Sequence, residues 1–403
     1  MRSLVIVSKG KNPYLTTKQG LRRFSLPHLQ GRKVLIKPNA ARLALPGDGV
    51  TTHPQVVAAA IDYLRERGVH RIVIGESCIF GVNAREAFQV TGMKEISEER
   101  EVELIDLDQV DPMEIAIPEG KVVKKIKVAA VLKEFDLIIS IPVMKTHMHT
   151  RVTLSIKNMK GLLWRREKAR FHRLRFERQA GKREKVLDIS ISEMASVLSP
   201  HLAIIDGTVG MEGMGPAYGP KKRTGLIVIG NNGVSTDAVA AKLMGFAPRD
   251  IPHLKLAAEK GLGEIDLRRV SVEPKDYLKW AIPFAPPPSR LSILYPGIVI
   301  HDEGSCSACL STLLVFLQDY HSSLTDYRLE DGSTHIGMGR NLNVCPRGTI
   351  LIGNCTSRMK GKGVFIQGCP PVGSQIVNRL EIVSSLNGSA AKKGGKGVRE
   401  NFS

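Results

Sequence analysis

The sequence predicts an α/β protein: a large three-layer domain with a central, mainly parallel sheet, followed by a small C-terminal cysteine-rich α+β module. Short apolar runs typical of buried strands recur from the N-terminus to about residue 260, and helix-like segments alternate with them. This alternation is typical of parallel sheets that carry helices on both faces. Five of the six cysteines follow residue 305, which predicts the separate module.

Length and composition are those of a globular protein with more than one domain. The chain has 403 residues, and a single core rarely grows beyond about 250 to 300 residues. Hydrophobic residues make up 42% and charged residues 24%, and no apolar run of membrane-spanning length occurs. Lysines interrupt the N-terminal apolar run before a signal peptide could form, so this run is predicted to be the first strand. We expect a cytoplasmic protein without a membrane span or a disulfide framework.

Five apolar runs are predicted to be buried strands. They are Val34–Ile36, Arg71–Ile74, Asp136–Ile141, Leu202–Ile205 and Leu226–Ile229. A helix is predicted to begin at Pro54, because proline suits the first turn and apolar residues recur at helical spacing over 57–64. Gly68 is typical of the position just after a helix. Residues 115–128 are predicted to form an inserted hairpin.

Composition predicts the domain boundaries. The α/β domain is expected to occupy residues 1–280, and the proline-rich residues 281–300 are typical of a linker or an ordered crossing segment. The cysteine-rich module follows over residues 301–386. Residues 387–403 are rich in Gly, Ser and Lys without periodicity, so a disordered tail is expected there.

Four cysteines are predicted to hold an iron–sulfur cluster, with 4Fe-4S as the expected type: Cys306, Cys309, Cys355 and Cys369. The first two form a C-x-x-C pair, and the others lie in glycine-bearing turns. Thiolates bind zinc as well, so zinc is the alternative. The thirteen residues between Cys355 and Cys369 differ from the short second pair of a zinc ribbon, and proline after a ligand cysteine is familiar from ferredoxin-type sites. Cys345, which also precedes a proline, is a substitute candidate for one of the four.

Polar residues follow the predicted strands at the sheet edge where ligands bind in open α/β folds. They are Lys37, Asn39, Glu76, Lys145, His147 and Asp206. Together they predict a site with two lysines, a histidine and two carboxylates. For any one of them alone, the alternative is a solvated loop residue. His147 and His149 stand two apart, which allows metal ligation or proton transfer in an extended segment but is also typical of surface or core histidines.

The segment Ser155–Gly161 predicts anion binding. It concentrates Lys157, Asn158 and Lys160, whose N–H donors suit a phosphate or carboxylate. It is not a P-loop, and no Gly-x-Gly-x-x-Gly follows the first strand, so neither familiar nucleotide-binding device is present in the sequence.

Positive charge is the other strong feature of the sequence. The net charge of +19 favours phosphates, carboxylates, nucleic acid or an anionic surface as partners. Residues 165–185 carry ten Lys or Arg and three Glu, with Phe171 and Phe176 among them. This stretch suits a nucleic-acid backbone with stacked bases, a basic helix whose apolar residues face the core, or a lid over an anionic site.

Six motifs in this order resemble one family. They are Lys37–Asn39, Thr51–Pro54, Gly75–Ser77, Lys145–His147, Thr153–Gly161 and Asp237–Gly245. From about residue 30 to 265 the chain resembles the DUF362 family of uncharacterised α/β proteins, many of which carry a ferredoxin-like module. The compact C-x-x-C-x-x-C-x-x-x-C run of bacterial ferredoxins is absent, so the resemblance implies a single cluster of less familiar geometry. It implies no substrate.

The leading hypothesis is a redox protein, an oxidoreductase if it is an enzyme, whose cluster exchanges electrons with an anionic substrate or partner at the strand ends. Lysines 37, 145, 157 and 160 would bind negative charge, His147 would transfer a proton, and Glu76 and Asp206 would orient His147 or hold a metal. Nucleic-acid binding with a structural zinc or cluster module is the alternative. An electron carrier or scaffold without a catalytic site is the third hypothesis.

Overall fold

The computed structural model describes residues 3–24, 29–79, 81–165, 167–174, 185–287 and 295–382. The chain divides into two compact units, Met1–Ser289 and Arg290–Ser403. The division falls within the proline-rich residues 281–300, and the predicted tail 387–403 lies outside the described residues. Within the described ranges, no helix has the length and apolar character needed to cross a membrane.

The described part of the first unit is built on a ten-stranded sheet. Its strands are β1 (Leu4–Lys9), β2 (Lys33–Pro38), β3 (Arg71–Glu76), β4 (Glu103–Asp106), β7 (Leu137–Ile141), β8 (Val143–His147), β9 (Arg151–Thr153), β10 (Leu202–Met211), β11 (Lys221–Gly230) and β12 (Ser271–Glu273). The main order is β12-β1-β11-β10-β7-β2-β3-β4, and β8 pairs with β10 and β9. Strands β10, β7, β2, β3 and β4 pair in parallel, whereas β11 runs antiparallel to β1 and β10. The predicted mainly parallel α/β sheet is therefore confirmed.

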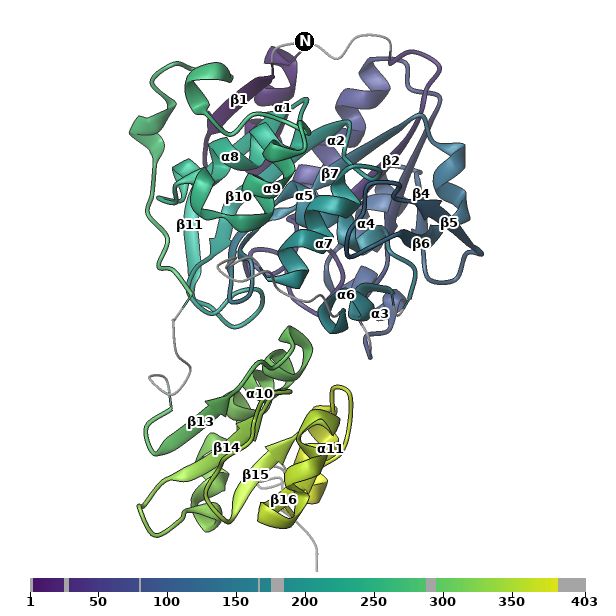
Figure 1. Cartoon of the computed structure of the whole chain (residues 1–403). Coiled ribbons are helices and arrows are strands. Elements are labelled where there is room, and N and C mark those ends of the chain that lie inside the picture. The colour runs from purple at the N-terminus through teal and green to yellow at the C-terminus, as the bar shows by residue number, and fades with distance from the viewer. Residues whose placement is uncertain are drawn as a thin grey trace, which may run out of the picture. The chain divides into compact units, whose positions relative to one another are not determined.

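Helices cover both faces of this sheet (Figure 1). The α-helices are α1 (Pro13–Arg23), α2 (Pro54–Glu66), α3 (Ala84–Val90), α4 (Met93–Glu99), α5 (Ser155–Asn158), α6 (Glu167–Arg173), α7 (Val186–Ala195), α8 (Gly233–Leu243) and α9 (Pro252–Glu259). Short 3-10 helices are η1 (Ala130–Glu134), η2 (Met159–Leu162), η3 (Pro248–Asp250), η4 (Leu267–Arg269) and η5 (Tyr277–Trp280). Helix α2 begins at Pro54 as predicted. The predicted hairpin is confirmed as the antiparallel pair β5 (Pro112–Ala116) and β6 (Lys125–Ala129).

Alternate side chains of each strand enter two different cores, because successive residues of a strand point to opposite faces. In β2, Leu35 packs in one core with residues of α7, α8 and α9. Its neighbours Val34 and Ile36 pack in the other core with residues of α1 and α2. The three-layer arrangement follows from this alternation and leaves the carboxyl ends of the parallel strands together at one edge.

The second unit is described as a four-stranded sheet with helices. Its strands are β13 (Ile298–Asp302), β14 (Thr334–Met338), β15 (Thr349–Ile352) and β16 (Gly363–Ile366), and its helices are α10 (Ser307–Tyr320), η7 (His321–Tyr327), η8 (Asn354–Lys362) and α11 (Gly373–Arg379). The strands lie in sequence order, and every pairing is parallel. The expected small module with helices and strands is present, and its pairing refines the α+β description, since all four strands pair in parallel and helical segments connect β13 with β14 and β15 with β16.

Candidate functional site

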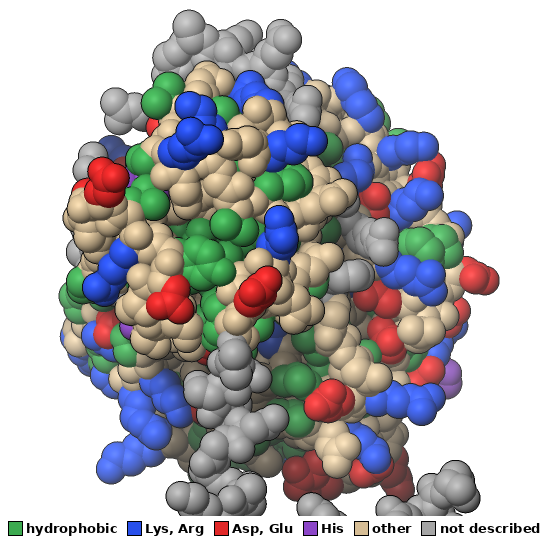
Figure 2. Space-filling view, turned by 90° about the horizontal axis from the view of Figure 1, so that it is seen from below, with side chains coloured by type: hydrophobic (Ala, Val, Ile, Leu, Met, Phe, Trp, Pro, Cys, Tyr) green, Lys and Arg blue, Asp and Glu red, His purple; other side chains and the backbone are tan. Residues whose placement is uncertain are grey.

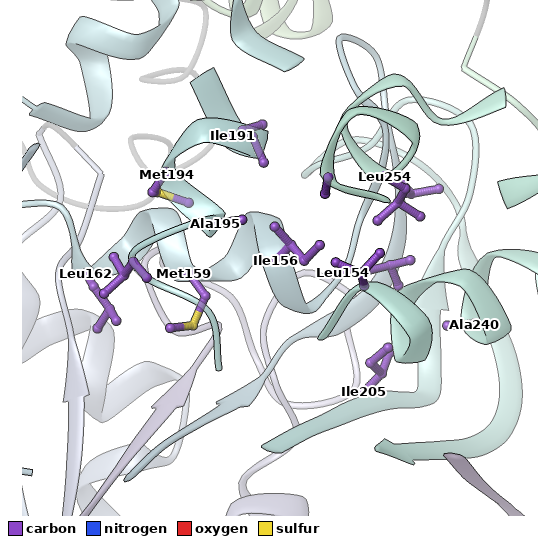
Figure 3. Close-up of a cluster of buried hydrophobic side chains, with 14 of the residues drawn as sticks. Leu154, Ile156, Met159, Leu162, Ile191, Met194, Ala195, Ile205, Ala240 and Leu254 are labelled. Carbon is purple, nitrogen blue, oxygen red and sulfur yellow. The ribbon is translucent and has the colours of Figure 1, made fainter. Parts of the chain in front are cut away.

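The segment Ser155–Leu162 carries three of the predicted anion-binding residues and is held by its apolar side chains. These side chains point into the core against α7, α8, α9 and β10 (Figure 3). The residues in contact are Leu154, Ile156, Met159 and Leu162 on one side and Ile191, Met194, Ala195, Ala240, Leu254 and Ile205 on the other. Burying one large aliphatic side chain stabilises by roughly 1.5–3 kcal/mol. With the apolar residues fixed in the core, the turns between them present Lys157 and Lys160 together, because residues three apart share a helical face.

Asp237 of α8 fixes the start of the same segment. Its carboxylate accepts hydrogen bonds from the Ser155 backbone N–H at 2.7 Å, the Ser155 hydroxyl at 2.5 Å and the Ile156 N–H at 3.0 Å. Burial raises the pKa of Asp237 to about 6, although these hydrogen bonds act in the opposite direction. The segment is thus tied to α8 by a buried carboxyl group.

Lys37 and Glu76 form a buried ion pair at the ends of adjacent strands β2 and β3. The Lys37 Nζ lies 2.7 Å from Glu76 Oε2, and both side chains are 1% exposed. Gly161 lies directly over this pair, since a Cβ there would lie 2.5 Å from Glu76 Oε1 and 2.6 Å from Lys37 Nζ. Burial lowers the pKa of Lys37, and Glu76 acts against this effect. The positive charge of Lys37 is therefore already matched by Glu76.

Two asparagines join the strand ends to the Ser155–Leu162 segment. The Asn39 side-chain amide donates to Asn158 Oδ1 at 3.2 Å. Asn158 Nδ2 donates to the Lys37 carbonyl at 3.0 Å and to Ser140 Oγ at 3.1 Å. Both predicted asparagines therefore make hydrogen bonds within the protein that position the neighbouring lysines.

Lys145 lies beside this network at the middle of β8. Its Nζ donates to the Val50 carbonyl at 2.6 Å and to Asn39 Oδ1 at 3.3 Å. Burial, followed by repulsion from Arg42, lowers the pKa of Lys145 to about 7, while Glu76 partly opposes the shift. Lys145 is 2% exposed and has no carboxylate among these hydrogen-bond partners.

Five basic side chains from three segments interact electrostatically around this point, and we call them the cationic cluster. They are Lys145 and His147 of β8, Lys157 and Lys160 of the Ser155–Leu162 segment, and His172 of α6. Lys160 Nζ contacts His172 Nε2, and Lys157 Nζ donates to Thr153 Oγ1 at 3.1 Å. Burial lowers the pKa of every member, to about 7 for Lys160, and like charges lower each one further.

Asp206, the other predicted carboxylate, makes different contacts. It accepts from the His53 N–H at 2.8 Å at the start of α2 and from Thr208 N–H and Oγ1 at 2.9 and 2.6 Å. Burial raises the pKa of Asp206. These contacts stabilise the strand-to-helix corner, and none of them joins Asp206 to His147.

Arg42 and His172 belong to the site but were not predicted from the sequence. Arg42 follows Asn39 by three residues and acts on both Lys145 and Lys157. His172 lies in the basic stretch 165–185, for which a lid over an anionic site was one of the interpretations. That interpretation was the feature of the sequence that pointed to His172. In the same helix, Phe171 is 1% exposed and packs in the core, so its ring has no free face for a base. Phe176 lies outside the described residues.

Positive and negative side chains are interspersed on the molecular face drawn in Figure 2. On the face drawn in Figure 2, Lys and Arg side chains are scattered among acidic and hydrophobic ones and do not form one continuous patch. Lys168 of the basic stretch is paired with Asp108 at 3.1 Å and contacts Ser77 Oγ at 2.5 Å.

In the second unit, the four predicted ligand cysteines follow the carboxyl ends of three parallel strands. Cys306 and Cys309 follow β13, Cys355 follows β15 and Cys369 follows β16. The pKa of Cys309 is raised by its hydrogen bond with Cys306, by burial, and by the nearby Cys355 and Cys369. The turns that carry these cysteines adjoin, since the Asn354 N–H donates to the Gly368 carbonyl at 2.8 Å and a Cβ on Gly353 would lie 3.1 Å from Cys309 Sγ. All six cysteines of the chain are free thiols.

Cys345 differs from these four in its surroundings. It packs with Leu342, Leu351 and Met359, whereas Cys309 packs in the larger core with residues of α10 and α11. Among the described residues, no group of three or more His, Cys, Asp or Glu side chains has the arrangement expected around a single metal ion. This holds for the His147 and His149 pair as well.

Comparison with known proteins identifies the first unit. Residues 34–242, just over half of the chain, match the family described as a domain of unknown function, DUF362. A thylakoid-associated protein of Synechocystis is 26% identical over 233 residues, which cover 58% of this chain and 68% of that protein.

Two solved structures are distantly similar. The lactate racemase apoprotein of Thermoanaerobacterium thermosaccharolyticum has a TM-score of 0.36 at 13% identity, over 51% of each chain. A Thermotoga maritima protein has a TM-score of 0.31 at 13% identity, over 62% of this chain and 60% of its own. The chain thus spans between half and two thirds of these proteins, and such scores carry no functional argument. The family match is decisive, and this chain belongs to the DUF362 family.

Proposed function

We propose that this protein is an iron–sulfur electron-transfer protein whose DUF362 domain binds an anionic substrate or partner. The observation that carries the proposal is that Cys306, Cys309, Cys355 and Cys369 follow the ends of three parallel strands, with adjoining turns around Gly353 and Gly368. Four thiolates are the usual ligand set of a [4Fe-4S] cluster. Free thiols throughout the chain also support a cytoplasmic location, because reducing compartments preserve them.

The residues present fit such a cluster in two respects. Hydrogen bonds from the Cys309 side chain and from the N–H groups of Ala308 and Cys309 lower the pKa of Cys306 to about 6, which favours the thiolate needed for ligation. Gly353 has φ +86°, and a Cβ there would lie 3.1 Å from Cys309 Sγ, so only glycine leaves this sulfur uncrowded. When bound, the cluster would supply one-electron transfer. Zinc on the same thiolates is the structural alternative.

Within the first unit, the cationic cluster would attract the negative charge of the substrate or partner. Lys145, Lys157 and Lys160 would bind it, and His147 would donate or accept a proton. Lys37 is matched by Glu76 and would position the site without binding the ligand. Should a reaction occur here, its class would be oxidoreductase.

The test is anaerobic purification of the full-length protein, followed by iron and acid-labile sulfide analysis and EPR. We expect a brown protein whose visible absorption bleaches on reduction. Single substitutions by Ala at Cys306, Cys309, Cys355 and Cys369 should each remove the EPR signal, while Cys78→Ala, in the first unit, should leave it unchanged. A colourless protein with stoichiometric zinc would overturn the proposal.

Nucleic-acid binding is the second candidate, supported by the net charge of +19. Its test is a titration with single- and double-stranded oligonucleotides at two salt concentrations. Affinity that collapses as salt rises would favour it. Lack of binding at low salt would remove it.

A further inference from the structure

We infer that the cationic cluster binds a compact multivalent anion bearing a phosphoryl group, and that protons enter the site when this anion binds. This inference rests on the proposed anion-binding role of the DUF362 domain and deepens it by naming the ligand class. It does not depend on the cysteines of the second unit.

The five basic side chains of the cationic cluster come from separate elements and converge. Lys145 and His147 lie on β8, and Lys145 pairs with Thr153 of β9, whose hydroxyl accepts from Lys157 Nζ at 3.1 Å. Lys160 of the same Ser155–Leu162 segment contacts His172 of α6 through its Nζ. Strand β8 and the Ser155–Leu162 segment are held rigidly, by sheet pairing and by the core contacts of Figure 3. Rigid placement of several donors around one point is what anion recognition requires.

Basic groups outnumber acidic groups around the cationic cluster. The charged and titratable groups that act on the cluster from outside are Arg42, Lys37, Lys168, His149, Glu76 and Asp188. Both carboxylates already have partners, Glu76 with Lys37 and Asp188 with His253 Nδ1 at 3.2 Å. The basic groups therefore exceed the acidic ones in a place where Lys145 and His147 are buried and Lys157, Lys160 and His172 are half-buried, so the neutral forms of these groups are favoured until a counter-charge arrives. An anion with several charges would supply what the protein lacks.

The number and kind of basic groups favour a phosphoryl group over a carboxylate. A single carboxylate brings one negative charge, which is too little for five basic groups. A phosphoryl group brings about two negative charges and three acceptor oxygens near neutral pH. Lysine ammonium groups act as point charges that suit phosphate oxygens from several directions, whereas planar carboxylates are better matched by an arginine fork.

Lys160 Nζ and His172 Nε2 are in direct contact. Two basic nitrogens repel each other when both are fully protonated, so this contact favours loss of a proton from Lys160 or His172. Burial and like charge lower the pKa of Lys145 and Lys160 to about 7, which agrees with proton loss at neutral pH. A bound anion reverses this effect, because negative charge favours the protonated form of a lysine or histidine.

The experiment is isothermal titration calorimetry of the full-length protein with inorganic pyrophosphate at pH 7.5. Two buffers with different ionisation enthalpies are compared, because proton uptake makes the observed heat depend on the buffer. We expect binding with uptake of about one proton or more. Phosphate and citrate are titrated in parallel to separate phosphoryl from carboxylate recognition.

Variants locate the site. Lys157→Met and Lys160→Met should each lower the pyrophosphate affinity at least about tenfold, while Lys160→Arg should retain binding but lose part of the proton uptake. Lys242→Met is the matched control, because Lys242 is an exposed lysine of α8. Circular dichroism and the unfolding midpoint show that each variant is folded.

Each contrary outcome overturns a stated part. Lack of pyrophosphate and phosphate binding, or an equal loss in Lys242→Met, overturns the site. Citrate binding tighter than pyrophosphate overturns the phosphoryl assignment, and heats independent of the buffer overturn proton uptake. Iron and sulfide are measured on the same samples, so failure of the proposed redox function is seen separately from failure of anion binding.

Discussion

The ammonium group of Lys37 lies 2.7 Å from the carboxylate of Glu76, with both side chains 1% exposed. The two residues stand at the ends of the neighbouring parallel strands β2 and β3. The same carboxylate accepts the N–H groups of Ala40 and Ser77, each at 2.9 Å. This pair ties together the loops after two strands, so its first role is to hold the floor of the site.

Breaking this pair should be costly. Glu76→Gln leaves a buried ammonium group without its counter-charge, and we expect the free energy of unfolding to fall by about 3–5 kcal/mol. Urea denaturation followed by circular dichroism measures the change. Glu98→Gln is the control, because its partner Lys94 and Glu98 itself are exposed, and the expected loss there is below about 0.5 kcal/mol. A Glu76→Gln protein as stable as wild type would contradict the structural role.

Gly161 should tolerate no side chain. In Gly161→Ala the added methyl group would meet Glu76 Oε1 and Lys37 Cε at 2.5 Å. We expect a loss of about 1–3 kcal/mol in the free energy of unfolding, the usual cost of overpacking, and weaker pyrophosphate binding. Gly361→Ala is the control, since a Cβ there meets nothing within 4 Å. Equal stability of the two variants would show that the packing over the ion pair is loose.

Asp237 should make stability depend on pH between about 4 and 6. Its folded pKa of about 6 exceeds the ordinary 3.8, so in this window the folded protein binds more protons than the unfolded chain. The free energy of unfolding contributed by this group therefore falls as pH rises, by about 3 kcal/mol in all at about 1.4 kcal/mol per pKa unit. Urea denaturation of wild type and Asp237→Asn at pH 4 and 7 measures it. If the free energy of unfolding changes with pH equally in wild type and Asp237→Asn, the pH dependence does not come from Asp237.

Cys345 should be dispensable for the proposed cluster. Its apolar neighbours Leu342, Leu351 and Met359 give it the surroundings of a core thiol. Cys345→Ala should keep iron, sulfide and the EPR signal at wild-type levels while losing about 1 kcal/mol of stability through the lost packing of one sulfur atom. If Cys345→Ala loses the EPR signal while Cys355→Ala or Cys369→Ala retains it, Cys345 is a cluster ligand in place of that cysteine.

Pyrophosphate affinity should weaken as pH rises above 7. The pKa values of Lys145 and Lys160 are lowered to about 7 in the free protein, so the protonated forms that bind an anion are present below this pH and are lost above it. Each linked proton lowers affinity about tenfold per pH unit above its pKa. Calorimetric titrations between pH 6 and 9 give the slope. If the pyrophosphate affinity stays the same between pH 6 and 9, these lysines are not the ligands.

Several features of the fold were predictable from local sequence. The five apolar runs, the helix beginning at Pro54 and the hairpin around residue 120 follow from periodicity and turn chemistry, which act over a few residues. The family resemblance carried by the ordered motifs is confirmed over residues 34–242. These are features whose causes lie within short stretches of the chain.

The site itself depended on contacts between distant segments. Lys37 and Lys145 were both predicted from the sequence to bind the anion. The tertiary structure gives Lys37 a carboxylate partner and leaves Lys145 with a carbonyl and an amide. It also adds Arg42 and His172 to the cluster, and turns Asp206 toward the start of α2.

The sequence by itself determined the five buried strands, the helix that begins at Pro54, the hairpin, the family, and which side chains carry positive charge and thiols. Only the tertiary structure decided which charges are paired and which basic groups gather in one buried or half-buried place. The physical reason is that pairing and desolvation depend on distances of a few ångströms between groups that stand tens or hundreds of residues apart in the chain. Such distances are set by sheet order and core packing, which no local pattern encodes.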